Sequence, residues 1–169
     1  MAKNLKAMGT AAFMTASALI GASTTMNFEG LRLKPYYDSV GIKTWCAGET
    51  EVGYKEEFTK SECELMYNIR YGYYSMRVMM MYNDVAQQLV TPEIHASITD
   101  MAYNVGVGTV EKSSMIRHIN AGKPTQACDA ILLYKKAGGY DCSIPGNKVC
   151  YGVWDRRVRV NKLCKGQTA

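Results

Sequence analysis

The feature that most constrains this chain is an uncharged run near its start, from Ala7 to Phe28, which comes after Lys3 and Lys6. As a helix, a run of this length is long enough to cross the hydrocarbon core of a bilayer. Ala, Gly, Ser and Thr dominate the run and strongly apolar residues are few, so we expect lipid to hold it only weakly. The run therefore predicts an export segment whose lysines stay on the cytoplasmic side.

Three interpretations of this segment are open. A secretory signal peptide would be cleaved after a small residue, such as Ala18 or Ala22. A permanent anchor would hold the rest of the chain on the outer face of the membrane, and a reversible anchor would begin in the same way and later leave the bilayer. We favour the reversible anchor, because Glu29, the first candidate catalytic residue, comes immediately after the run and cleavage near Ala22 would leave only a short lead into it.

Size, charge and cysteines constrain the remainder of the chain. The chain has 169 residues, 47% of them hydrophobic, which suffices for one packed domain and is too short for two. A net charge of +5 favours an anionic partner, which leaves nucleic acid, a membrane surface or the bacterial wall. The sequence has no zinc-finger spacing and no base-reading motif, so nucleic acid is not expected. Six cysteines without a Cys-x-x-Cys pair indicate disulfides in an oxidising compartment, or buried thiols in a reducing one.

Local patterns predict an α+β fold. The stretch 30–54 is rich in Gly, Tyr and Thr and predicts short strands and turns. Thr59 and Glu62 form a candidate capping box for the first long helix. Behind it, apolar residues recur at helical spacing: Leu65, Ile69, Tyr73, Met76 and Met80. Helices are expected at 61–82, 92–104, 109–120, 124–134 and 153–163, with a loop at 137–152. We therefore expect a small β-hairpin lobe, a mainly helical lobe, and an active-site cleft between them.

Two carboxylates and a hydroxyl in the strand region are candidates for chemistry. Hydrolysis of a glycosidic bond needs one carboxylic acid to protonate the leaving oxygen and a second carboxylate to direct water. Glu29 and Asp38 are candidates for these two roles, and Thr44 lies further along in the expected hairpin. The pairing alone is a weak signal, because a Glu at a helix end and an Asp in a turn are common.

The spacing of these residues strengthens the interpretation. The segment from Glu29 to Asp38 reads Glu-Gly-x-Arg-Leu-x-x-Tyr-x-Asp, and Gly41 and Thr44 come next at intervals of three. This pattern resembles the catalytic signature of the phage-type lysozymes, glycoside hydrolase family 24, and the resemblance extends over almost all of the chain after Phe28. One departure is Glu49, which stands where many relatives have His.

The resemblance implies a lysozyme-like fold and a role for each site residue. Glu29 would be the general acid, Asp38 would activate or orient the water, and Thr44 would help to hold that water. Members of the family often pair this Glu with an Arg, such as Arg157 here. The resemblance also implies the disulfides Cys46 with Cys63, Cys128 with Cys164, and Cys142 with Cys150. No cofactor and no metal are expected, since His95 and His118 have no nearby ligand partners in the sequence.

The leader joined directly to such a domain resembles the signal-arrest-release endolysins of phages. This resemblance implies a membrane segment at 1–27 and a lysozyme catalytic domain at 28–169. The enzyme would sit in the host inner membrane with its N-terminus cytoplasmic and its catalytic domain periplasmic, inactive until release makes it a soluble periplasmic monomer. Its substrate would be the β-1,4 bond between N-acetylmuramic acid and N-acetylglucosamine in peptidoglycan. The alternatives are an ordinary secreted lysozyme, a non-catalytic wall-binding protein on the same fold, and a membrane-active leader fused to an inert domain.

Overall fold

The computed structural model describes residues 3–29, 32–37, 41–46, 48–50 and 55–167, with residues 22–29 as helical backbone only. The first elements are α1 (Leu5–Met8), α2 (Thr10–Glu29), the strands β1 (Arg32–Tyr37) and β2 (Lys43–Cys46), and the long helix α3 (Lys60–Met79). Next along the chain are the helices α4 (Asp84–Leu89), α5 (Pro92–Val105), α6 (Val107–Glu111), α7 (Ser114–Asn120), α8 (Pro124–Asp129) and the 3-10 helix η1 (Ala130–Leu133). The chain closes with the strands β3 (Lys136–Ala137) and β4 (Tyr140–Asp141) and the helix α9 (Tyr151–Cys164).

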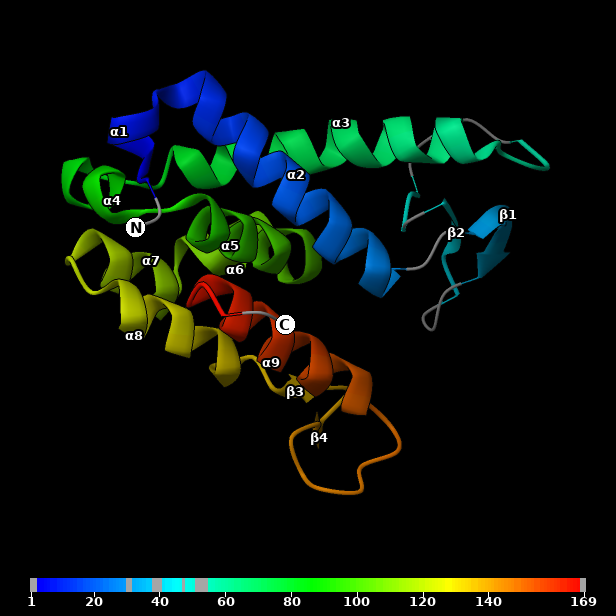
Figure 1. The fold of residues 1–169 in the computed structure, drawn as a ribbon. Helices are drawn as coiled ribbons and strands as arrows, with labels where there is room; N and C mark the ends of the chain where they lie inside the picture. Colours follow the sequence, from blue (N-terminus) through cyan, green and yellow to red (C-terminus); the bar gives the residue numbers. More distant parts are fainter. Residues whose placement is uncertain (1–2, 30–31, 38–40, 47, 51–54, 168–169) are drawn as a thin grey trace.

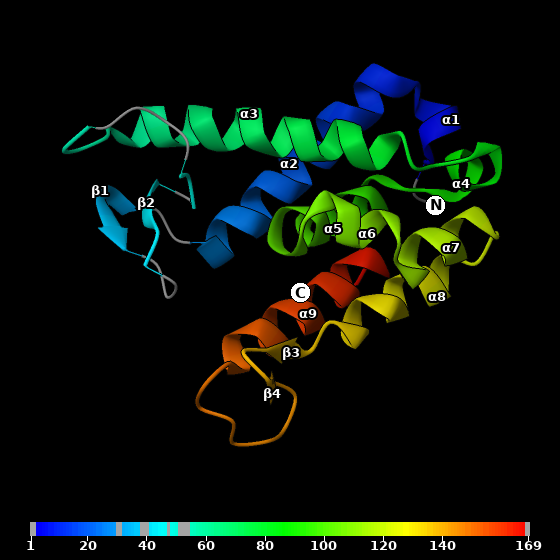
Figure 2. The same cartoon turned by 180° about the vertical axis from the view of Figure 1, so that it is seen from behind.

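These elements form two lobes (Figure 1). The antiparallel β1–β2 hairpin lies at one end of the molecule, and α3 runs from it to the helical lobe, where α5 packs against α2, α3 and α9. The second view shows the same separation of the hairpin from the helices (Figure 2). The expected α+β arrangement is confirmed, and the loop expected at 137–152 contains most of a second, very short hairpin, β3–β4, which begins at Lys136.

The start of α3 agrees with the predicted capping box, and α5 begins at the residue expected. The Thr59 side chain accepts a hydrogen bond from the Glu62 backbone, and the Glu62 side chain accepts one from the Thr59 backbone, which completes the predicted capping box. At the start of α5, Thr91 caps the helix and Pro92 occupies its first turn. These signals are local, so they are independent of the tertiary fold.

The buried face of α3 is not the apolar set seen in the sequence. Every member of that set is exposed: Leu65, Ile69, Tyr73, Met76 and Met80. The buried face consists instead of Cys63, Tyr67, Tyr71, Ser75 and Val78. Several of these side chains carry a polar tip, and this face packs against α2 and α5, which supply partners for such tips. The spacing correctly predicts a helix but does not identify which side of it is covered.

The uncharged leader forms α2 and packs as part of the helical lobe. Phe13 and Ser17 are fully buried, and the Tyr67 hydroxyl donates a hydrogen bond to the Gly21 carbonyl over 3.4 Å. A Cβ atom on Gly21 would lie 1.7 Å from the Tyr71 hydroxyl oxygen, so the helix approaches α3 as closely as a glycine allows. Within the described residues, no helix combines the length and hydropathy that a membrane crossing requires. The expected boundary between residues 27 and 28 falls inside α2 and stays a prediction.

The core of the helical lobe contains a fully buried histidine. The two ring nitrogens of His95 lie 2.8 Å from the Ser75 hydroxyl and 3.1 Å from the Tyr82 hydroxyl. Phe13 from the leader packs on the same ring, with ring centroids 5.4 Å apart. Burial lowers the pKa of His95 to about 3, so the imidazole stays neutral at physiological pH.

The close approach at Gly21 can be tested against a second helical glycine. A Gly21→Ala substitution should lower the free energy of unfolding by about 1–3 kcal/mol, because the added methyl group overlaps the Tyr71 side chain. The matched control is Gly72→Ala on α3, where an added Cβ meets no atom within 4 Å. This substitution should stabilise the helix by up to about 1 kcal/mol, because alanine has a higher helix propensity than glycine. Denaturant unfolding of both variants measures the difference, and equal stability of the two would contradict the packing described.

Acid sensitivity should depend on His95. The unfolded chain binds a proton on this residue near pH 6.5, whereas the folded chain does so only near pH 3, so stability is lost as pH falls from about 6.5 towards 3. His95→Gln should therefore flatten the decline of unfolding free energy with falling pH, by on the order of 2 kcal/mol between pH 7 and 4.5. Chemical unfolding over this pH range measures the slope, and His118→Gln serves as control. A His95→Gln slope equal to that of the unsubstituted chain would show that the group does not titrate in this way.

Candidate active site

Two of the three candidate catalytic residues lie on described elements, Glu29 on α2 and Thr44 on β2. Glu29 is the last residue of α2, and both views show this end of the helix approaching the β1–β2 hairpin (Figures 1 and 2). Thr44 lies on β2, opposite Tyr36 on β1. Asp38 falls between the two strands and lies outside the described residues. The structure thus gives Glu29 and Thr44 a place on the backbone, and the cleft expected between the lobes stays a prediction.

The Thr44 side chain is buried and held by a hydrogen bond. Thr44 is 3% exposed, and its hydroxyl donates to the Ile42 carbonyl oxygen over 2.9 Å. A hydroxyl has one hydrogen to donate and two lone pairs that accept. Because the hydrogen points to Ile42, the oxygen of Thr44 is left as an acceptor. Such an oxygen can bind a hydrogen of a water molecule.

The chain directly after Thr44 makes a tight turn held by backbone pairing. Trp45 and Glu49 form two backbone hydrogen bonds to each other, of 3.0 and 2.9 Å, across the turn. Cys46 adopts a positive φ of 51°, which is uncommon for a residue other than glycine. The Trp45 ring stacks on Phe58 with ring centroids 5.9 Å apart. These contacts give the hairpin lobe its own small buried cluster.

Two interactions attach this turn to α3. One is the disulfide between Cys46 and Cys63. The other is an ion pair between the Glu49 carboxylate and the Arg70 guanidinium, in which the Glu49 side chain is buried. The sequence singled out Glu49 only as a departure from the family pattern and gave no signal for Arg70, because the two residues lie 21 positions apart and pair only through the tertiary fold.

Two arginines in the middle of α9, Arg156 and Arg157, are buried in the protein. The Arg156 Nε and Nη2 atoms donate to the two carboxylate oxygens of Asp100, over 3.2 and 2.9 Å. Arg157 Nε donates to the Tyr134 carbonyl over 3.0 Å, and its Nη2 donates to the Asn104 side chain. Burial lowers the pKa of Arg157 to about 10. Its Nη1 atom is buried and has no hydrogen-bond partner within the described ranges, so the expected pairing of Arg157 with Glu29 stays a prediction.

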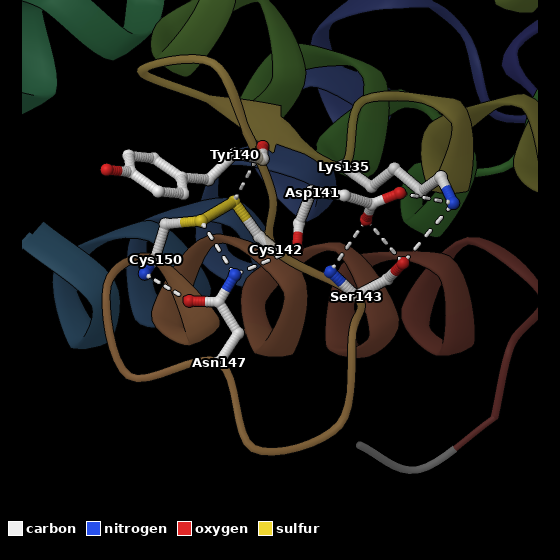
Figure 3. Close-up of polar contacts among 7 residues, drawn as sticks. All are labelled: Lys135, Tyr140, Asp141, Cys142, Ser143, Asn147 and Cys150. Atoms are coloured by element: carbon white, nitrogen blue, oxygen red, sulfur yellow. Dashed lines mark hydrogen bonds and ion pairs between the residues drawn. A yellow bond between two sulfur atoms is a disulfide. The ribbon is translucent and has the colours of Figure 1, made fainter.

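All three predicted disulfides are present: Cys46–Cys63, Cys128–Cys164 and Cys142–Cys150. The third closes the loop between β4 and α9 (Figure 3). Inside this loop, Asp141 pairs with Lys135 over 2.9 Å and accepts two hydrogen bonds from Ser143. The bonds from Ser143 and Lys135 lower the pKa of Asp141 to about 2. The loop is therefore held by both a covalent bond and a polar network.

Comparison with known proteins identifies what this arrangement resembles. The family model described as phage lysozyme matches residues 26–160. A SAR-endolysin from Enterobacteria phage P21 is 31% identical over 161 residues, which cover 94% of this chain and 90% of that protein. Among solved structures, the endolysin from Escherichia coli O157:H7 phage FAHEc1 has a TM-score of 0.71 at 22% identity, covering 85% of this chain and 89% of that one. A variant of P22 lysozyme has the same TM-score at 24% identity, covering 86% and 95%. The two structures show that the fold is lysozyme-like.

Proposed function

This chain belongs to the phage lysozyme family, and we propose that Glu29, Asp38 and Thr44 are its catalytic residues. The enzyme is a glycoside hydrolase, an endolysin that acts as a muramidase on peptidoglycan. The bond that it hydrolyses is the β-1,4 linkage between N-acetylmuramic acid and N-acetylglucosamine. The observation that carries the site assignment is the Thr44 hydroxyl, which is buried and has its hydrogen directed at Ile42.

Each residue has a defined part in the reaction. Glu29 donates a proton to the glycosidic oxygen as the bond to the anomeric carbon breaks. A water molecule on the opposite face of the sugar adds to that carbon and gives up its proton to Asp38. The Thr44 oxygen accepts a hydrogen bond from the same water and so fixes its direction of attack. After one turnover Glu29 is deprotonated and Asp38 is protonated, and proton exchange with solvent restores the starting protonation states.

The leader supplies a way to control this site. Glu29 ends α2, so its position depends on how α2 packs on the helical lobe through Phe13, Ser17 and Gly21. While the uncharged run lies in the bilayer, Glu29 is held at the membrane surface and the catalytic set is incomplete. Release lets α2 dock and brings Glu29 to the hairpin. In this sequence of events segment 1–27 is first a host inner-membrane anchor and later a helix of a soluble periplasmic monomer, and the SAR-endolysin relative supports it.

The acid assignment is tested by removing one proton donor. Glu29→Gln keeps the size of the side chain but cannot protonate the leaving oxygen, so peptidoglycan hydrolysis should fall by at least about 10²–10⁴-fold. Glu111→Gln, at an exposed glutamate on α6, is the matched control and should keep full activity. Release of soluble fragments from purified peptidoglycan measures both, with circular dichroism to confirm folding. Equal hydrolysis by Glu29→Gln and the unsubstituted enzyme would exclude this residue as the acid.

The tether is tested at positions of α2 that are exposed in the docked structure. Thr15→Leu with Ala18→Leu raises the hydropathy of the run without touching buried contacts, so a larger share of the protein should stay in the membrane fraction and lysis should be delayed. Thr15→Ser with Ala18→Ser is the control and should leave release unchanged. Membrane fractionation and intact mass of the soluble protein are the measurements. A soluble chain that begins near Thr24 would show ordinary signal cleavage and contradict the tether.

A further inference from the structure

We propose that the Glu49–Arg70 ion pair is a positioning element of the muramidase reaction, which orients the hairpin that carries Thr44 relative to α3. Glu49 is 4% exposed, and its carboxylate contacts the Arg70 guanidinium on α3. The inference rests on the proposed role of Thr44 in holding the attacking water. It assigns no contact with substrate to either residue of the pair.

The pair is the second of two attachment points on one helix. Arg70 lies seven residues after Cys63, which is two helical turns, so both side chains leave α3 on the same side and are separated by about 10 Å along the axis. The disulfide fixes one point of the turn, and Met66 of α3 packs against the buried cluster around that point. The ion pair fixes the other end of the turn, so the two together determine the direction in which the hairpin extends.

The path from the pair to Thr44 is short and stiff. Glu49 exchanges two backbone hydrogen bonds with Trp45, and Trp45 is the residue directly after Thr44. A displacement of Glu49 is therefore passed to the strand that bears the catalytic hydroxyl. A misplacement of about 1 Å at a reacting group can cost on the order of 10²-fold in rate, so a small movement of the turn is enough to affect catalysis.

Arg70 supplies the charged partner of the buried Glu49 carboxylate. The Oε1 atom of Glu49 is buried and has no hydrogen-bond partner in the described part of the chain, so the contact of Oε2 with Arg70 is what compensates its charge there. Although burial disfavours its charged form, Glu49 and Tyr74 hold the pKa of Arg70 above its usual value. Removing either partner leaves a charge without its counterpart, and the turn must move to hydrate it.

The same arginine is linked to the surface on which α2 docks through Tyr74, whose hydrogen bond helps to raise the pKa of Arg70. Tyr74 contacts Tyr103 with ring centroids 5.2 Å apart, and Tyr103 contacts Tyr67 at 5.7 Å. Tyr67 in turn donates a hydrogen bond to Gly21 of α2. Tyrosines on α3 and α5 thus lie between the hairpin attachment and the docking surface of the leader, so the pair orients Thr44 relative to the same tyrosines on which α2 docks.

Charge exchange provides the test. Glu49→Gln and Arg70→Gln should each lower kcat at least about tenfold with little change in KM, and the double exchange Glu49→Arg with Arg70→Glu should recover most of the loss. Glu64→Gln, which breaks the exposed Lys60–Glu64 pair on the same helix, is the control and should leave kcat unchanged. In a Trp154→Phe background, Trp45 is the remaining tryptophan, and its fluorescence should shift in the single variants and return in the exchange.

Two results would overturn the proposal. One is a Glu49→Gln variant whose melting temperature falls while kcat and Trp45 fluorescence stay as in the parent, because the pair would then only stabilise the fold. The other is a folded exchange variant that recovers no activity. If the exchange does not fold, Glu49→Asp decides instead, since it keeps the charge and should have a kcat between those of Glu49→Gln and the parent. Failure of the proposed catalytic set appears separately, as full activity in Glu29→Gln.

Discussion

Helix α3 is the element on which the arrangement of this enzyme depends, because both halves of the proposed catalytic set are attached to it. The hairpin with Thr44 is joined to this helix through Cys63 and Arg70. Helix α2, which ends in Glu29, packs on the same helix and on α5, with Gly21 against Tyr71. A helix is stiff over 20 residues, so two groups attached to it keep a fixed relation without touching each other.

The character of the buried face of α3 reflects this double task. Tyr67 and Ser75 each bring a hydroxyl that hydrogen-bonds to a neighbouring helix, whereas Tyr71 fixes the approach of α2 by its bulk against Gly21. Hydrogen bonds to the Gly21 carbonyl and to His95 are directional, whereas contacts between aliphatic side chains are not. The buried face therefore fixes the orientation of α2. The Leu, Ile and Met side chains on the opposite side of α3 could not do this, because apolar contacts are not directional.

What the sequence could predict was decided by how local each feature is. The cap at Thr59 depends on a residue three positions away, and the structure confirms it. The spacing around Glu29 was specific enough to identify the family, and the family resemblance in turn led to all three disulfides. The covered side of α3 was not predictable, since two stripes of helical spacing compete and the choice depends on α2 and α5.

The ion pairs form a second class that sequence reasoning missed. Arg70 with Glu49 and Arg156 with Asp100 join residues that are far apart in the chain, and neither pair belongs to a recognisable motif. Arg156 and Arg157 share a helix with Arg159 and Lys162, yet both are buried. A charged residue shows from sequence only that it needs a counterpart or water, and the fold determines which of these it finds.

The Cys46–Cys63 bridge connects the assembly of this enzyme to its location. Among its described residues, the hairpin lobe has a small buried cluster built around Trp45, Phe58 and the bridge itself, which is little apolar surface to hold these residues by packing alone. In a reducing compartment the bridge does not persist. A chain still in the cytoplasm of the cell that makes it would then have its water-directing strand loosely attached. On the export route proposed above, the oxidising space beyond the inner membrane closes this bridge and so completes the attachment of the hairpin, which gives a chemical delay separate from that of the membrane anchor.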